Sequence, residues 1–224
     1  MNGFVRGVAR SMIESFELPE PIVEIGSFQV PGQEELINLR SLLPNRNFTG
    51  VDFRPGPGVD VVANVENLPF ADGSVGTVLA FSVFEHVKHF WKGFDEVFRI
   101  LRPDGVLLVC TPFYFHVHDY PSDYWRFTPE AIDSLLERYP TRVLGWHGPN
   151  RRPLNVWAAA FSEGARTPTE ERIAAYKQRL AKYAKEPVGW SRKLRFRLGR
   201  ILCGRRPFAT HLDREKWSTE VRCT

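Results

Sequence analysis

The sequence predicts an α/β protein with a Rossmann-like, mostly parallel sheet of seven strands, helices on both faces, and a helical, basic C-terminal extension. Short apolar runs alternate with helix-periodic segments through the first five strands, which is the pattern of a parallel sheet covered on both sides. Two later runs, joined by a turn rich in Gly, Pro, Asn and Arg, predict an edge hairpin. The seven predicted strands lie within 21–28, 48–52, 59–63, 76–81, 106–110, 142–146 and 154–161.

The helices are predicted from apolar residues at three- and four-residue spacing and from signals at their ends. Segment 34–43 follows a Pro-Gly turn, and a helix through Phe94 to Leu101 stops at Pro103-Asp104-Gly105. Thr128-Pro129-Glu130 is an N-cap followed by a first-turn proline, and 167–170 form a capping box. The apolar and aromatic side chains of 1–18 recur at helical spacing, which predicts an N-terminal helix. We expect one domain over 1–162 and a helical, basic extension over 163–224.

Composition limits the class of protein. Hydrophobic residues make up 43%, which indicates a folded globular chain, and no apolar run approaches the roughly 20 residues that span a bilayer. The first 20 residues lack the continuous apolar core of a signal peptide. The three cysteines show neither metal-ligand nor disulfide spacing, so we expect free thiols and a cytoplasmic location.

The run PIVEIGSF at 21–28 organises the rest of the chain. It is a short apolar strand that ends in an acidic residue and breaks at Gly26. A strand that stops at a glycine before a helix leaves backbone N–H groups at its carboxyl end. Asp52 closes a second apolar strand about one βαβ unit downstream, where a carboxylate can accept the two hydroxyls of a nucleotide ribose.

These motifs, in this order, resemble the class I S-adenosylmethionine-dependent methyltransferases, and most of all their type-11-like branch. The resemblance covers about residues 19–161 and rests on VEIGS, GVDFRPG, ANVENLPFADGSVGTVLAFSVFEHV and FRILRPDGVLLVCTPF. It implies S-adenosyl-L-methionine as the cofactor, bound over the carboxyl ends of the first strands. It also implies these cofactor-binding residues: Glu24, Gly26, Ser27, Asp52, Phe53, Asn64, Val65, Glu66, Phe81 and Ser82.

Two positions depart from the family pattern. Asn64 stands where an aspartate is more common, and its amide oxygen can accept an adenine N–H as a carboxylate does. Phe28 stands where the family has a second glycine, and a side chain of this size disfavours positive φ. We therefore expect the loop after the first strand to take a different path, using Pro31-Gly32.

The candidate catalytic residues follow the fourth and fifth strands. His118, with Asp119 or Asp123, would form a base and its orienting partner, and His86 is a second candidate base. Each histidine also has a purely structural interpretation. Tyr120, Tyr124 and Trp125 suit a ring-shaped or isoprenoid acceptor, although 124–127 could equally be core packing. A metal bound by His116, His118 and Asp119 is an alternative on ligand types, but methyl transfer needs none, so we expect no metal.

The basic charge is concentrated in one segment. Residues 190–206 hold seven of the Lys and Arg side chains and no acid, and without them the net charge of +4 becomes about −3. The interleaved apolar residues favour peripheral contact with an anionic membrane over nucleic acid, and a solvated tail remains open. Deleting 187–224 would remove either binding function.

The sequence thus predicts a methyltransferase acting on a small-molecule, sugar-linked or lipid-linked acceptor, with oxygen as the expected methylated atom. Two alternatives stay open. The first is a catalytically inactive cofactor-binding or scaffold protein, which Phe28 motivates. The second is an RNA methyltransferase that grips RNA with the basic tail.

Overall fold

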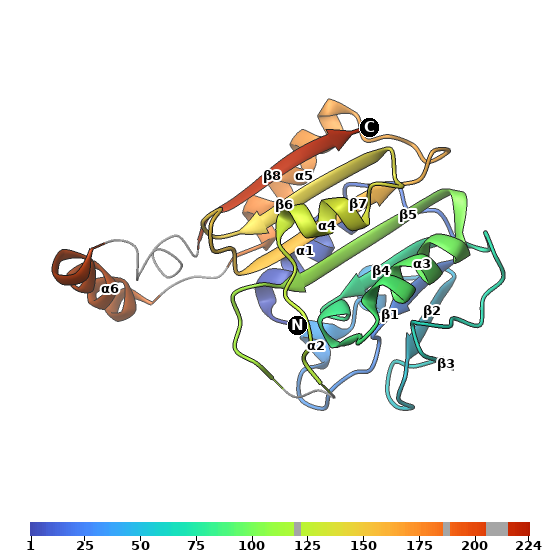
Figure 1. Cartoon of the computed structure of the whole chain (residues 1–224), viewed down its shortest axis with the longest axis horizontal. Helices are drawn as coiled ribbons and strands as arrows, with labels where there is room; N and C mark the ends of the chain where they lie inside the picture. Colours follow the sequence, from blue (N-terminus) through green and yellow to red (C-terminus); the bar gives the residue numbers. More distant parts are fainter. Residues whose placement is uncertain (119–121, 186–188, 205–214) are drawn as a thin grey trace.

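The centre of the molecule is a single twisted sheet (Figure 1). The computed structural model describes residues 1–118, 122–185, 189–204 and 215–224. Within these residues the sheet has eight strands in the order β3-β2-β1-β4-β5-β7-β6-β8. Their bounds are β1 (Ile22–Ile25), β2 (Phe48–Asp52), β3 (Val61–Val62), β4 (Val75–Phe81), β5 (Leu101–Pro112), β6 (Thr141–His147), β7 (Asn155–Phe161) and β8 (Trp217–Cys223).

The pairing confirms the predicted topology. Strands β1 to β5 are mutually parallel, and β7 runs antiparallel to both β5 and β6, which gives the expected late hairpin. The chain moves outward from β1 through β2 to β3 and then returns to place β4 on the other side of β1. The strand order therefore reverses between β1 and β4, and open α/β sheets bind ligands at the carboxyl ends of such strands.

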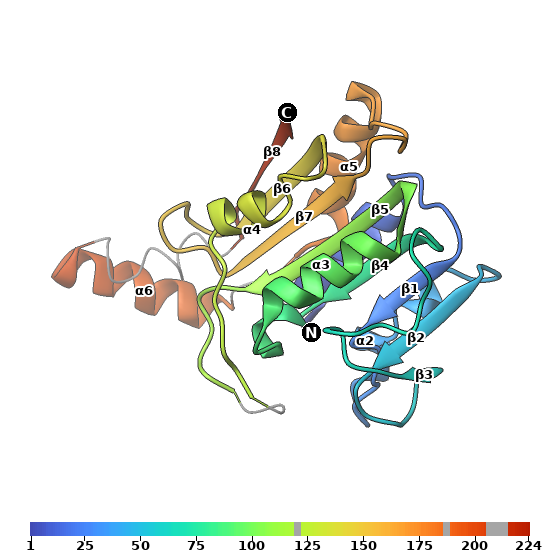
Figure 2. The same ribbon diagram turned by 45° about the vertical axis from the view of Figure 1, so that its right-hand side comes forward.

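Helices cover both faces of the sheet (Figure 2). The helices α1 (Gly3–Ile13) and α5 (Glu170–Tyr183) pack on one face, while α3 (Phe90–Ile100) and α4 (Pro129–Leu135) pack on the other. Side chains along β5 alternate between the two cores: Leu107 and Val109 face α3 and α4, and Leu108 faces α1 and α5. This two-residue alternation within the apolar run 106–110 of β5 is what a doubly covered sheet requires.

The helix predicted over 34–43 is broken into two short pieces. One is α2 (Glu34–Ile37) and the other is the 3-10 turn η1 (Arg40–Leu42). Asn38 leaves the helical region with ψ of 89°, and the Arg6 guanidinium of α1 donates a hydrogen bond of 2.9 Å to its carbonyl oxygen. A tertiary partner for this carbonyl replaces the intrahelical bond, which sequence periodicity does not reveal.

The end of the chain supplies a strand that sequence analysis did not predict. Strand β8 pairs antiparallel with the edge strand β6 over the register Thr141↔Cys223 to His147↔Trp217. Its residues are partly or largely exposed, so it lacks the apolar run that marked the other strands. The region 163–224 therefore contains the edge strand β8 besides its two helices, α5 and the basic α6 (Trp190–Cys203). The cap of α5 is Thr169, whose hydroxyl accepts from the Arg172 amide.

Candidate active site

A cavity of about 650 Å³ opens at the carboxyl ends of β1, β2 and β4. This size lies within the range of about 300–1,000 Å³ that is usual for small-molecule sites. Nine of the ten predicted cofactor residues line it, as do His86 and His118. The tenth, Ser27, does not line the cavity. The lining cofactor candidates are Glu24, Gly26, Asp52, Phe53, Asn64, Val65, Glu66, Phe81 and Ser82.

The turn after β1 depends on Gly26. Its φ is +78°, and a Cβ there would lie 2.6 Å from the Val83 side chain, so a larger residue would be both strained and crowded. The amides of Gly26 and Ser27 both donate to the Val51 carbonyl oxygen, at 2.8 and 3.1 Å. These two N–H groups, expected to point to the cofactor, are thus used to hold β1 against β2. The Ser27 side chain is buried.

The loop beyond Gly26 takes the path expected from Phe28. Phe28 avoids positive φ, and Gly32 takes it instead, with φ of +80°. The Gln33 amide donates to the Val30 carbonyl oxygen at 3.1 Å, which closes a turn with proline and glycine at its centre. The Phe28 amide donates to Asp52 Oδ2 at 3.3 Å. The bulky residue therefore lines the cavity and its backbone orients the carboxylate.

Asp52 is held at the end of β2 by backbone donors. Its Oδ1 accepts from the Arg54 amide at 3.0 Å, and the Arg54 Nε lies 3.5 Å away. The Arg54 guanidinium stacks over the Phe28 ring at 4.3 Å and lies 5.1 Å from the Phe53 ring. Arg54 was not predicted as a site residue. Its position next to Phe53 in the sequence was the available signal, but a stacking partner 26 positions away is not visible there.

Asn64 and Glu66 form the adjoining wall. The Asn64 Oδ1 accepts from the Glu66 amide at 2.9 Å, so one of its lone pairs is already used, while the other remains for a ligand donor. The Glu66 carboxylate contacts His89 Nδ1 at 2.9 Å. Partial burial acts to raise the pKa of Glu66, but the hydrogen bonds from the His89 ring and amide outweigh it and lower the pKa. Glu66 is accordingly an anion at neutral pH.

Two histidines that line the cavity contact each other. His86 lies in the 3-10 turn η2 (Phe84–His86), and His118 lies in the loop after β5. Their rings meet edge to face with centroids 4.9 Å apart. The His86 Nδ1 is 2.7 Å from the Ser122 carbonyl oxygen, which can only accept, so this nitrogen carries the hydrogen and Nε2 keeps its lone pair. Burial lowers the pKa of His86 and favours the neutral ring.

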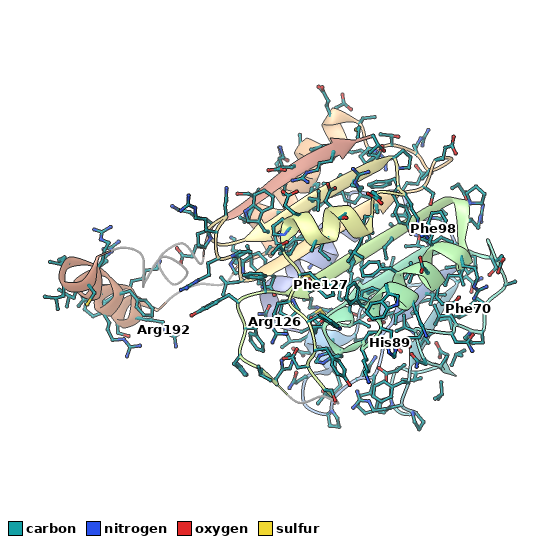
Figure 3. The ribbon with its side chains drawn as sticks, in the orientation of Figure 1. Phe70, His89, Phe98, Arg126, Phe127 and Arg192 are labelled. Carbon is teal, nitrogen blue, oxygen red and sulfur yellow. The ribbon has the colours of Figure 1, made fainter. Side chains whose placement is uncertain are left out.

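Asp123 is the carboxylate that the structure places against His118. Its Oδ2 lies 2.9 Å from His118 Nδ1 and also accepts from the His118 amide at 3.0 Å. Arg126 forms a bidentate ion pair with the same carboxylate, and this pairing holds the pKa of Asp123 far below its usual range. Arg126 projects from the loop between β5 and α4 (Figure 3). The other predicted partner, Asp119, and the neighbouring Tyr120 lie outside the described residues.

The loop that carries Asp123 is fastened to η2. The amides of Tyr124 and Trp125 donate to the Glu85 carbonyl oxygen at 2.8 and 3.2 Å, and the Trp125 indole donates to the Val87 carbonyl oxygen at 3.1 Å. Tyr124 lines the cavity and is about half exposed, whereas Phe127 is buried in the core. The segment 124–127 thus has one residue at the cavity and one in the core, and contact with an acceptor stays a prediction.

Two buried glutamates lie at the base of this site. Glu24 lines the cavity, and Glu85 is fully buried with neither carboxylate oxygen hydrogen-bonded to another described residue. Burial raises the pKa of each carboxyl group to about 8. Both groups therefore hold a proton at neutral pH.

We expect Glu85→Gln to flatten the pH dependence of stability. The unfolded carboxyl ionises above about 4.5 and the folded one only near 8, so the free energy of unfolding falls as pH rises through this window. Each such group contributes a slope of about 1.4 kcal/mol per pH unit. Glu85→Gln removes one contribution and leaves that of Glu24. Chemical denaturation at several pH values measures the slope, with exposed Glu137→Gln as the control. An unchanged slope in Glu85→Gln would contradict the burial argument.

Three further findings concern the described residues. They contain no cluster of three His, Cys, Asp or Glu side chains arranged to hold a metal ion. None of their helices is long and apolar enough to cross a membrane. The three cysteines are free thiols, Cys110 buried and Cys203 and Cys223 exposed.

The fold and the cavity agree with the class that the sequence resembles. The sheet order, the reversed strand β7 between β5 and β6, and a cavity beside an acidic residue at the end of β2 match what the resemblance to class I methyltransferases implies. The comparisons agree: residues 33–109 match the methyltransferase-domain family of type 11. Over residues 33–109 the chain is thus similar to this family, which confirms the resemblance found in the sequence. The cofactor of this family is S-adenosylmethionine.

Curated relatives align over a short part of the chain. A probable S-adenosylmethionine-dependent methyltransferase of Mycolicibacterium smegmatis is 46% identical over 57 residues, which is 25% of this chain and 22% of the relative. An uncharacterized methyltransferase of Mycobacterium tuberculosis is 38% identical over 60 residues, covering 27% of this chain and 24% of the relative. The chain thus spans about a quarter of the length of the relatives it matches.

Solved structures share the fold. A 1,6-didemethyltoxoflavin-N1-methyltransferase of Burkholderia thailandensis, with bound 1,6-didemethyltoxoflavin and S-adenosylhomocysteine, superposes with a TM-score of 0.55 at 15% identity, covering 71% of this chain and 79% of that one. A methyltransferase of Archaeoglobus fulgidus gives a TM-score of 0.55 at 13% identity, covering 70% and 93%. At this identity the likeness concerns the fold alone.

Proposed function

We propose that this protein transfers the methyl group of S-adenosylmethionine to an oxygen atom of a small-molecule, sugar-linked or lipid-linked acceptor. One observation carries the proposal. One cavity is lined both by nine of the ten predicted cofactor residues and by two contacting histidines, His86 and His118. Cofactor-binding groups and a proton acceptor that share one space are the two parts that methylation of a hydroxyl requires.

The residues present fit the proposed cofactor. Asp52 is nearly buried and accepts one backbone hydrogen bond on each oxygen, which leaves further lone pairs for two ribose hydroxyls. Phe53 is half exposed beside it and offers a ring face for adenine. Gly26 lets the backbone at the end of β1 lie close against the Val83 side chain, since a Cβ there would lie 2.6 Å from it. These three positions are the ones we assign to ribose, adenine and the methionine end.

The chain's own residues would position the acceptor and take its proton. When bound, the cofactor supplies a methyl group on a sulfonium, which the acceptor oxygen displaces in line. His118 Nε2 would accept the hydroxyl proton of the acceptor, and S-adenosylhomocysteine would be the leaving group. We assign Nε2 because Nδ1 faces Asp123, which stabilises the imidazolium, and Arg126 fixes Asp123 in turn. His86 borders the same wall in its neutral form.

The aromatic side chains of the loop after β5 favour the acceptor classes that we name. Tyr114, Phe115, Tyr124 and Trp125 are between 37% and 49% exposed on this loop, and Tyr124 lines the cavity. Flat aromatic faces suit a sugar ring or an isoprenoid chain better than an ionic acceptor.

Calorimetric titration with S-adenosylmethionine and, separately, S-adenosylhomocysteine tests the cofactor half of the proposal. We expect micromolar binding of both, because the cavity stays open with Phe28 in its wall. Failure of both to bind would favour a scaffold protein. Binding followed by methylation of RNA, and of no sugar or lipid-linked sugar in an acceptor screen, would favour an RNA methyltransferase.

A further inference from the structure

The basic helix α6 stands apart from the sheet and its covering helices (Figures 1 and 2). Five large apolar side chains of this helix are exposed, among them Trp190 at 79% and Leu202 at 85%. Soluble surfaces seldom gather apolar residues in this way unless something covers them. The five are Trp190, Leu194, Leu198, Ile201 and Leu202.

These five residues share one side of the helix. Their spacing of i, i+4, i+8, i+11 and i+12 places them along a single stripe of an α-helix. Phe196 falls on the opposite side and is only partly exposed. We call these five residues the apolar stripe of α6. The apolar stripe faces away from the side of the helix on which Phe196 is shielded.

The charges of α6 point to an anionic partner. The helix carries Arg192, Lys193, Arg195, Arg197 and Arg200 and no acidic residue. Arg195 and Arg197 lie at the two edges of the apolar stripe by helical geometry. Lys193 is paired with Glu215 at 2.8 Å, which leaves the four arginines as the main basic groups. Arg205 and Arg206 of the sequence-predicted basic segment lie outside the described residues.

An apolar stripe edged by arginines fits the surface of a bilayer. The 14 residues of α6 are too few to span a membrane, which takes about 20. A basic amphipathic helix lies in the interface plane instead, with its apolar side among the acyl chains and its cations at headgroup level. Contact with a nucleic-acid backbone would use the arginines and leave the stripe exposed.

We propose that α6 docks this protein on an anionic lipid bilayer, with the apolar stripe inserted and the arginines at the headgroups. The loop that follows β5 lies on the same side of the molecule as α6. Strand β5 points toward the side on which α6 lies, and the loop with exposed Tyr114 and Phe115 continues from its end (Figures 1 and 2). If the proposed function holds, this placement selects the lipid-linked acceptors among the classes named above.

Co-sedimentation with vesicles tests the docking. The full chain is mixed, without cofactor, with vesicles of equal parts phosphatidylcholine and phosphatidylglycerol, and with vesicles of phosphatidylcholine alone. We expect binding to the anionic vesicles and weakening of that binding by added salt. The triple variant Leu198→Ser, Ile201→Ser, Leu202→Ser should bind at least about tenfold more weakly, because it loses buried apolar area.

Two further variants complete the experiment. Phe196→Ser is the matched control, since it removes an apolar side chain of α6 outside the stripe, and it should bind as the wild type does. The double variant Arg195→Gln, Arg197→Gln should lose binding to anionic vesicles. Thermal melts show whether each variant folds. The proposal is overturned if the wild type does not sediment with anionic vesicles, if the triple variant binds them equally well, or if the wild type binds polyuridine RNA instead.

Because the vesicle assay needs neither cofactor nor turnover, its failure is distinct from failure of the proposed function. Calorimetry with S-adenosylmethionine needs no vesicle. If the protein binds the cofactor but not the vesicles, the proposed activity stands and the docking proposal fails. A protein that binds only the vesicles loses the activity and keeps the docking helix.

Discussion

His118→Gln is expected to lower the turnover of methyl transfer by about 100-fold or more. Removal of a positioned general base typically costs 10²–10⁴-fold, and glutamine retains the approximate bulk of the ring without a titratable nitrogen. The variant should keep its affinity for S-adenosylmethionine, because His118 is not among the residues that we assign to cofactor binding. Single-turnover kinetics separates the chemical step from binding.

The chain offers a matched control two residues away. His116 is exposed and stacks on Phe115 at 4.2 Å, so His116→Gln changes the same residue type without touching Asp123. It should keep nearly full turnover. The turnover of Asp123→Asn should fall toward that of His118→Gln, since the substitution removes the charge that stabilises the imidazolium. Full activity in His118→Gln together with a large loss in His86→Gln would assign the base to His86 instead.

Asp52→Ala is expected to weaken the binding of S-adenosylmethionine more than tenfold, which corresponds to about 1.4 kcal/mol. The carboxylate is the acceptor that we assign to both ribose hydroxyls, and hydrogen bonds to a charged group are among the stronger ones. The substitution also removes the side-chain acceptor of the Phe28 amide. Isothermal titration of the variant gives the dissociation constant directly.

The control for Asp52 is a carboxylate away from the cavity. Asp72 is largely exposed and pairs with Arg99 at 2.6 Å, so Asp72→Ala should leave cofactor affinity unchanged. A thermal melt with Asp52→Asn, which retains one oxygen for the backbone donors, distinguishes loss of a ligand contact from loss of fold. Unchanged affinity in a folded Asp52→Ala would show that the ribose assignment is wrong.

The sheet was predictable because its apolar runs are a local property of the sequence. Seven of the eight described strands fall on those runs, and their order along the chain fixes the place where the cavity opens. Strand β8 carries no such run, because an edge strand keeps much of its surface in solvent. The break in the predicted helix 34–43 also escaped prediction, since it depends on Arg6, which is far away in the sequence.

The candidate site divides in the same way. Residues at strand ends, such as Gly26 and Asp52, were located from spacing alone, and they do line the cavity. The partners of these residues were not located. These partners are contacts between side chains, namely Arg54 over Phe28 and Arg126 on Asp123. The sequence offers several acids and cations as a partner for each of these residues and does not show which one is chosen. The preference for Asp123 as the partner of His118 emerged only from the folded loop.

Strand β8 changes how the end of the chain can be manipulated. Its Arg222 donates to Glu130 and Asp133 of α4, and α4 directly follows the loop that holds His118 and Asp123. Deleting 187–224 would thus remove Arg222, the ion-pair partner of α4. It would also expose the main-chain groups of β6 as an unpaired edge that can pair with other chains. A truncated protein that aggregated or lost activity would report on a damaged sheet, whether or not α6 touches a membrane. Substitutions confined to α6 test membrane docking without disturbing the sheet. A purification tag is better placed away from β8, the strand at the edge of the sheet.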